Sequence, residues 1–413
     1  MNKIQNMLNE LCPNGVEYRK LGDLCSLVTK QTGFDYSNTI KPSLTREQEE
    51  GSLPYIQTRH FSGKDFNYQT EFYVPKTTWE KFPKLVMDSP VLLISIVGSL
   101  GNIGLYPGNR KCFLGGAICI ARVKADYNIS FIYHYMLSPE GQKQIKKVTK
   151  GSGQATITIE DIRNFEIPIP PIEVQNEIVG YLDSFTELTA ELTAELTARQ
   201  KQYEFYRDNL LNFKNLPRGG RDDQWRTITI GSIGEVRMCK RILKNQTNTE
   251  SGIPFYKIGT FGKVADAFIS ESIYTRYKSS YPFPKKGDIL ISAAGTIGRA
   301  VVYNGEDAYY QDSNIVWIDN DESLVLNSYL RHLYSVIDWK VEGGTVKRLY
   351  NNNLKSTKIA VPSINAQKRI VDILDKFERL TTDITEGLPA EIKARQQQYE
   401  YYRDQLLTFK RAS

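Results

Sequence analysis

Residue types that perform acid–base, nucleophilic or metal chemistry are few in this chain, and none stands at the spacing of a familiar site. The three histidines, His60, His134 and His332, lie far apart in the sequence. His134 and His332 fall at matching places in two helix-like segments, where a repeated residue of a helix face is a simpler interpretation than a catalytic role. We therefore expect no catalytic residue, no bound metal and no cofactor.

The motifs of base-modifying and nucleotide-binding enzymes are also missing. An amino-methyltransferase holds the flipped base in a loop of Asp or Asn, two prolines and an aromatic residue, whereas Pro170-Pro171 stands between two isoleucines. The run Gly98-x-x-Gly101-x-x-Gly104 does not fit the dinucleotide fingerprint, and no GxxxxGK[ST] loop occurs. Asp288 follows Pro284 without the Glu-x-Lys of a nuclease centre. The residues favour a chain that binds over one that catalyses.

Basic and polar residues in loop-like sequence suit double-stranded DNA as the partner. Lys, Arg, Ser and Thr contact phosphates, and Arg, Lys, Asn and Gln recognise base edges. The candidates in the first half are Lys30, Gln31, Thr32, Arg59, His60, Lys64, Lys150, Ser152 and Gln154. Those in the second half are Lys240, Arg241, Lys244, Lys257, Thr260, Arg299, Lys347 and Arg348. Recurrence at matched places favours the loops at 150–154 and 345–348, although ordinary solvated surface remains an alternative for each residue.

The elements that must position these residues occur twice. Ala198–Lys214 (ARQKQYEFYRDNLLNFK) and Ala394–Lys410 (ARQQQYEYYRDQLLTFK) are identical at 13 of 17 positions. Upstream, IPPIEVQNEIV and VPSINAQKRIV match, and each continues to a Leu-Asp-x-Phe, at Leu182–Phe185 and Leu374–Phe377. Weaker echoes include Ile94-Ser95 to Gly101 and Ile291-Ser292 to Gly298. A period near 200 residues indicates tandem domain duplication and not a solenoid.

Composition and charge bound the class of protein. Of the 413 residues 40% are apolar, enough for ordinary cores, and the net charge of +6 with a pI of about 8.8 mildly favours a polyanionic partner. Five cysteines without a shared spacing indicate a reducing compartment. The N-terminal residues lack the apolar core of a signal peptide, and the longest apolar stretch is far shorter than the roughly 20 residues of a membrane span. We expect a cytoplasmic protein that does not enter a membrane.

The variable and the repeated parts predict different structures. Strand-like runs rich in Val and Ile, beside few helices, predict two similar globular domains of mixed α/β fold. From Ile178 to Phe213 a 4-3-4-3 spacing of mostly apolar residues predicts a long helix with a heptad seam, repeated after Pro362. Two such helices would pack antiparallel, coiled-coil-like, between the domains, which gives a pseudo-two-fold internal repeat. Gly387 and Pro389 predict a break in the second helical segment.

Three copies of Glu-Leu-Thr-Ala fill positions 187–198 of the first helical segment. One tetrad is about 6 Å of helix, compared with about 3.4 Å per DNA base pair along one strand. The tetrads therefore suit a length adjuster, while good helix-forming filler of repetitive origin is an equal alternative.

Together these features resemble the specificity subunit of Type I restriction–modification enzymes over essentially the whole chain. The elements that carry the resemblance are IPIPPIEVQNEIVGYLDSF, VPSINAQKRIVDILDKF, the tetrads and the paired ARQxQYExYRDxLL segments. It implies target-recognition domains at residues 1–168 and 217–361, followed by helical spacer regions at 169–216 and 362–413. In that family each domain recognises one half of a split DNA target, and the helices hold the domains apart. The helices also bind two methyltransferase subunits, and restriction (translocase/nuclease) subunits join in the assembled complex.

Tyr and Arg are enriched at interface anchors, so residues of the repeated helices are candidates for subunit docking. These are Arg199, Tyr203, Tyr206, Arg207, Arg395, Tyr399, Tyr402 and Arg403. Packing within the helix seam is the alternative for the aromatic ones. For the chain as a whole, the alternatives are a fused enzyme and a coiled-coil scaffold that binds two protein partners.

Overall fold

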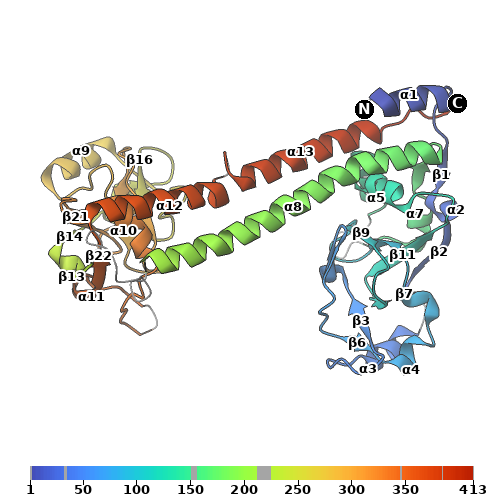
Figure 1. The fold of residues 1–413 in the computed structure, drawn as a ribbon, viewed down its shortest axis with the longest axis horizontal. Coiled ribbons are helices and arrows are strands. Elements are labelled where there is room, and N and C mark those ends of the chain that lie inside the picture. The colour runs from blue at the N-terminus through green and yellow to red at the C-terminus, as the bar shows by residue number, and fades with distance from the viewer. Residues whose placement is uncertain are drawn as a thin grey trace. The chain divides into compact units, whose positions relative to one another are not determined.

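The computed structural model describes residues 2–31, 35–149, 156–211, 225–344, 347–383 and 385–412. Contacts divide the chain into two units, Met1–Leu192 with Ile392–Ser413, and Thr193–Glu391. Each unit combines one globular domain with helical segments from two different parts of the chain (Figure 1). Helix α8 (Ile172–Leu211) contributes its first half to unit 1 and its second half to unit 2.

The main sheet of unit 1 is antiparallel, in the order β2-β11-β8-β9. Its strands are β2 (Cys25–Lys30), β11 (Ile118–Val123), β8 (Val91–Ser95) and β9 (Ile103–Tyr106). All five residues of β8 are buried because both faces of the sheet are covered. Leu92 and Ile94 pack with the helices, whereas Val91 and Leu93 pack with a second sheet. Because side chains along a strand point alternately to opposite faces, neighbouring residues of β8 enter two different cores.

Smaller elements complete unit 1. The second sheet has the order β6-β3-β10-β7, in which β3 and β10 are parallel. Its strands are β6 (Tyr73–Val74), β3 (Leu53–Ile56), β10 (Cys112–Leu114) and β7 (Val86–Met87). The remaining strands form the ribbon of β1 (Tyr18–Lys20) with β12 (Glu166–Pro168) and the hairpin of β4 (Phe61–Ser62) with β5 (Asp65–Phe66). The helices are α1 (Asn2–Leu11), α2 (Leu21–Leu24), α3 (Lys41–Ser43), α4 (Lys76–Trp79), α5 (Ile129–Leu137), α6 (Pro139–Val148) and α7 (Ile159–Arg163).

Unit 2 repeats this plan. Its main sheet, β14-β21-β18-β19, comprises β14 (Gly234–Arg237), β21 (Ile315–Asn320), β18 (Ile289–Ser292) and β19 (Ala300–Val302). Ile289 and Ile291 again face the helices while Leu290 faces the second sheet. That second sheet has the order β15 (Thr247–Asn248), β17 (Phe268–Ile269), β16 (Ile253–Tyr256) and β20 (Tyr309–Tyr310). The ribbon is β13 (Arg226–Thr229) with β22 (Lys358–Val361), and the helices are α9 (Glu271–Ser280), α10 (Asn327–Tyr334) and α11 (Asn351–Ser356). The predicted pair of similar mixed α/β domains is confirmed.

Each unit contains one antiparallel helix pair. In unit 1, Ile178 and Leu182 of α8 share a core with Leu406, at the end of α13 (Leu388–Leu406), while Phe185 contacts Tyr402 one turn earlier. In unit 2, Leu211 of α8 shares a core with Ile370 of α12 (Ile364–Thr382). The predicted seam is therefore used in both units, with a different partner helix for each half of α8.

The predicted break of the second helical segment is confirmed. Helix α12 ends at Thr382 and α13 begins at Leu388, with Pro389 in the first turn, where a missing N–H costs little. The space for a side chain at Gly387 is closed, because a Cβ there would lie 2.5 Å from the carbonyl oxygen of Arg379. Glycine is thus required for the chain to turn tightly past the end of α12.

Candidate nucleic-acid interface

Two matched turns, which we call the glycine turns, connect strands of the main sheets at residues 96–102 and 293–299. Gly98 and Gly101 have φ angles of 77° and 73°, and Gly295 and Gly298 have φ angles of 64° and 83°. These left-handed conformations favour glycine because it has no Cβ. The amide of Gly101 donates to the Ser95 carbonyl at 3.1 Å, and that of Gly298 donates to the Ser292 carbonyl at 2.9 Å. The echo seen in the sequence is one turn built twice.

In both units a glycine turn bridges to the backbone that ends or directly follows a basic loop favoured by the sequence. In unit 1, Thr156 forms an antiparallel bridge with Val97 directly after the first loop. In unit 2, Arg348 forms the equivalent bridge with Ala294, and the amide of Leu349 donates to the Ala293 carbonyl at 2.9 Å. The candidates Thr32, Lys150, Ser152 and Gln154 lie outside the described residues, as does Thr345.

The two described candidates of the second loop differ in exposure. Lys347 is exposed. Arg348 is half-buried, and its guanidinium donates to Asn314 Oδ1 at 2.5 Å and to Ser313 Oγ at 3.5 Å. Arg348 therefore fastens the loop to the strand connection before β21, which leaves Lys347 as the side chain directed to solvent.

Two candidates of unit 1 are turned into the domain. Gln31 is fully buried; its amide donates to the Leu114 carbonyl at 3.0 Å and its Oε1 accepts from the Tyr55 hydroxyl at 2.9 Å. His60 is buried, and its Nδ1 accepts from the Gln57 amide at 3.1 Å. Since both side chains hold loops inside the domain, we correct the expectation that they face DNA and leave them out of the proposed surface.

The remaining candidates of unit 1 lie nearer to solvent. Arg59 is exposed and forms an ion pair with Glu71 at 2.7 Å, and Lys30 is half-buried at the end of β2. Lys64, in the turn between β4 and β5, forms an ion pair with Asp183 of α8 at 2.6 Å. Lys64 therefore links the domain to its helix.

Outside the loop at 345–348, the exposed candidates of unit 2 are Lys240, Arg241 and Lys244. The Lys240 ammonium lies 5.0 Å from the centroid of the Tyr281 ring. The other three candidates are half-buried and have internal partners. These are Lys257, paired with Asp266 at 2.8 Å, Thr260, bonded to the Lys257 backbone, and Arg299, which donates to the Phe261 carbonyl at 2.8 Å.

The candidates for subunit docking mostly pack within the units. Tyr203, Tyr399 and Tyr402 contact the hydrophobic cores, as the seam alternative expects. Tyr206 is 39% exposed but stacks on Phe377. The four arginines are half-buried: Arg207 and Arg403 lie over the rings of Tyr203 and Tyr399, Arg199 bonds Glu195 and Gln202, and Arg395 bonds Gln398.

Two aromatic residues that were not among the candidates are the most exposed of the described aromatic residues in the repeated segments. Phe205 is 64% exposed and Tyr401 is 59% exposed, and they occupy the same position of the two copies. The signal was present in the sequence, since an aromatic residue stands outside the seam in both copies. A paired exposure of this kind makes this position a candidate contact surface in each unit.

Two copies of one α/β domain, each with a glycine turn that bridges to the backbone at or just after a basic loop sequence, define a duplicated binding chain. A match to the family described as Type I restriction modification DNA specificity domain covers residues 13–199 and 222–394. The chain belongs to this family.

Individual relatives agree. The chain is 44% identical over 404 residues to a protein assigned as the type I restriction enzyme specificity subunit S.HindORF215P of Haemophilus influenzae, covering 95% of this chain and 96% of that protein. It is 36% identical to the EcoR124I/EcoR124II specificity subunit of Escherichia coli, over 59% of this chain and 63% of that one. Among solved structures, the S subunit from M. genitalium aligns with a TM-score of 0.52 at 16% identity, over 95% and 96% of the chains, and shares the fold.

The resemblance found in the sequence is thereby confirmed, and with it the predicted class of a non-catalytic DNA-specificity chain. The alternatives of a fused enzyme and a coiled-coil adaptor are not favoured. Within the described ranges no helix is both long and apolar enough to cross a membrane.

Proposed function

We propose that this chain is the DNA-recognition subunit of a type I restriction–modification complex and that each globular domain recognises one half of a bipartite target. The observation that carries the proposal is the recurrence, in both units, of a bridge from the glycine turn to the backbone that ends or directly follows a basic loop sequence: Val97 to Thr156 and Ala294 to Arg348. The bridge repeats while the loop residues differ, KGSGQ at 150–154 against TVKR at 345–348. A constant frame with different loops suits two half-targets of different sequence.

The proposed recognition surface consists of exposed or half-buried cations and the loops beside them. In unit 1 it comprises Lys30 and Arg59, and in unit 2 it comprises Lys240, Arg241, Lys244 and Lys347. From the sequence we also assign the segment 150–154, which lies outside the described residues, to the surface of unit 1. Lysine and arginine in loops contact phosphates first, and base contacts then give sequence specificity. The proposed domains extend over residues 1–168 and 217–361, with helical spacer regions at 169–216 and 362–413.

The proposed partners are two methyltransferase subunits, one for each unit, and through them the restriction subunits. An equal site in each unit supports this stoichiometry, since Phe205 and Tyr401 are exposed at the same position of the repeat. Aromatic side chains of this kind are frequent anchors of protein interfaces. A cytoplasmic location, where such a complex meets its DNA, belongs to the same proposal.

Domain exchange tests the proposal. Residues 16–168 are replaced by the corresponding part of a relative, and the methylated sites of the complex are mapped. One half-target should change while the other stays intact. If both halves changed together, two independent recognition domains would be excluded. A gel shift with the methyltransferase partner on random duplexes separates DNA recognition from the adaptor alternative, for which no sequence would be enriched.

A further inference from the structure

In unit 1 a buried histidine joins the recognition domain to both helices of the pair. His134 of α5 is fully buried, and its Nε2 lies 2.7 Å from Asp183 Oδ1 on α8. Its Nδ1 lies 2.9 Å from the hydroxyl of Tyr399 on α13. Because a carboxylate only accepts hydrogen bonds, Nε2 carries the proton and Nδ1 accepts from Tyr399. Lys64 approaches the same Asp183 oxygen at 2.6 Å.

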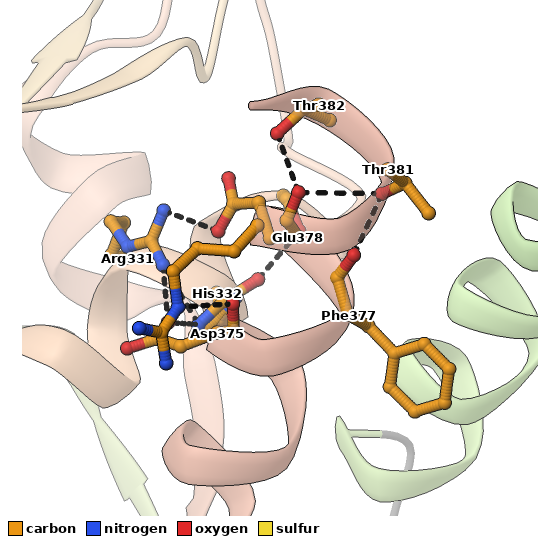
Figure 2. A network of polar contacts seen from close by, with 9 residues as sticks. Arg331, His332, Asp375, Phe377, Glu378, Thr381 and Thr382 are labelled. Carbon is orange, nitrogen blue, oxygen red and sulfur yellow. Dashed lines mark hydrogen bonds and ion pairs between the residues drawn. The ribbon is translucent and has the colours of Figure 1, made fainter. Parts of the chain in front are cut away.

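Unit 2 contains the same pair of histidine and aspartate with a different cation (Figure 2). His332 of α10 is buried, and its Nε2 lies 2.7 Å from Asp375 Oδ1 on α12. Arg331 replaces the lysine: its guanidinium contacts Asp375 at 2.6 Å and Glu378 at 2.7 Å. Tyr203, which matches Tyr399 in the repeat, packs against the core of this unit.

In each unit a buried glutamine forms a second polar contact between the globular domain and the helix. The Gln175 side chain accepts from the Asn128 amide at 3.0 Å, just before α5, and the Gln367 side chain accepts from the Leu326 amide at 2.8 Å, just before α10. In both helices the glutamine precedes the aspartate by eight residues, about two turns. Two polar contacts along one helix fix both the rotation of the helix and its distance from the domain. Apolar packing alone fixes them far less strictly.

Burial, with the help of nearby cations, lowers the pKa of each histidine. Burial lowers the pKa of His134, and Lys64 and Arg403 lower it further against the opposing effect of Asp183; Tyr133 and Tyr399 also face the ring. Burial and then Arg331 lower the pKa of His332 against Asp375 and Glu378. Burial alone would raise the pKa of Asp183, but hydrogen bonds from His134 and Lys64 outweigh it and lower that pKa.

The cluster of His332, Asp375 and Glu378 has the donor types of a metal site. Arg331 already neutralises both carboxylates, so a cation is present there without a metal. The matching cluster of unit 1 likewise holds Lys64. Because histidine, aspartate and a cation recur in both units, we interpret each cluster as a polar contact that holds the globular domain on its helix.

We propose that His134 and His332 are positioning residues: each fixes the angle of its recognition domain on the helices, and together they set the spacing at which the two half-targets are recognised. The inference rests on the proposed function. It explains why glutamine and Leu-Asp-x-Phe are identical in the two helical segments although the domains differ. A different domain that has a histidine at the same place of its helix can therefore make the same contact with the aspartate of the helical segment.

The test uses the full chain in complex with its methyltransferase partner. DNA duplexes carry the two mapped half-targets separated by the native spacer or by spacers one and two base pairs shorter or longer. His332→Ala should reduce the preference for the native spacer by about fivefold, the value of roughly one net hydrogen bond, without changing the half-target sequences. His332→Gln, whose amide replaces the Nε2 donor, should restore most of the preference.

Two further variants distinguish a positioning role of His332 from a general loss of stability. Leu330→Ala truncates the core beside the same helix and should lower stability but leave the spacer preference unchanged. In Arg331→Met the pKa of His332, followed by NMR, should rise, because Arg331 lowers it in the wild type. An unchanged spacer preference in folded His332→Ala, or an equal loss in Leu330→Ala, would overturn the positioning role. A wild-type complex without any bipartite target would overturn the proposed function itself, and this inference with it.

Discussion

The ring of Phe185 stacks on that of Tyr402, with centroids 5.4 Å apart and planes 25° apart. The repeat places the same pair in unit 2, where Tyr206 stacks on Phe377 at 5.4 Å and 28°. In each stack the phenylalanine comes from a Leu-Asp-x-Phe element and the tyrosine from an ARQ segment, which lies more than 210 residues later in unit 1 and more than 170 residues earlier in unit 2. The two repeated motifs thus match because they meet each other.

Removal of one stack should loosen one helix pair. Phe185→Ala should lower the free energy of unfolding by about 1–2 kcal/mol, the range for a half-buried ring that loses an aromatic partner. Phe377→Ala should have a similar effect through the other unit. Urea denaturation measures both, and Tyr401→Ala, at an exposed neighbouring position, is the control. Equal losses in the control would show that the stacks contribute nothing specific.

The repeats and the periodicity of the sequence were enough to predict the helix seam and the helix break. The heptad spacing predicted the seam at Ile178 and Leu182, and the Gly387–Pro389 pair predicted the break before α13. Inward-facing polar residues were missed, because a glutamine in loop-like sequence is buried only if distant groups satisfy it. For Gln31 those groups are the Leu114 carbonyl and the Tyr55 hydroxyl, which the fold brings together from other strands. Local sequence carries no record of such partners.

The exposed aromatics of the repeat should matter for assembly and not for folding. Phe205→Ala or Tyr401→Ala should weaken binding of one methyltransferase subunit by tenfold or more (roughly 1.4 kcal/mol), as for an interface anchor, and leave the urea midpoint unchanged. Mass photometry at limiting partner concentration should then show one bound subunit in place of two. Glu204→Ala, exposed beside Phe205, is the matched control. If a variant with both Phe205→Ala and Tyr401→Ala still bound two methyltransferase subunits, the docking surface would lie elsewhere.

Lys347 should contribute a phosphate contact. Lys347→Ala should weaken binding on all DNA sequences and reduce the slope of log K against log salt by about one unit. Lys358→Ala, an exposed lysine of the β22 ribbon, should leave the slope unchanged. A loss confined to one sequence would indicate base recognition, and unchanged binding would remove this loop from the recognition surface.

Acid should destabilise the chain through its buried histidines. The pKa values of His134 and His332 are lowered by burial, so the unfolded chain takes up protons below about pH 6.5 while the folded chain does not. The stability that this difference gives is complete above about pH 6.5 and falls as the pH drops toward the lowered pKa values, by up to about 1.4 kcal/mol per pH unit for each histidine. Urea midpoints at pH 7.5 and 5.5 measure the loss, which should be smaller in His332→Gln. An equal loss in that variant would assign the pH dependence to other groups.

The tetrads allow the spacing of the recognition domains to be tested directly. They lie within α8, which runs without a break from Ile172 to Leu211. Deletion of Glu191–Ala194 shortens the helix by about 6 Å and turns the residues after it by roughly 40°, since four residues exceed one turn of 3.6. The seam keeps its leucine, because the following tetrad moves into the place of Leu192. A four-residue deletion is equivalent in phase to a three-residue insertion, which paired helices absorb by local overwinding. Methylation mapping should therefore find both half-targets unchanged and the spacer between them shorter by one or two base pairs, at about 3.4 Å for each. Insertion of one tetrad should lengthen the spacer by the same amount. An unaltered spacer with full activity in both variants would mean that the tetrads are filler and that α12 and α13 set the distance.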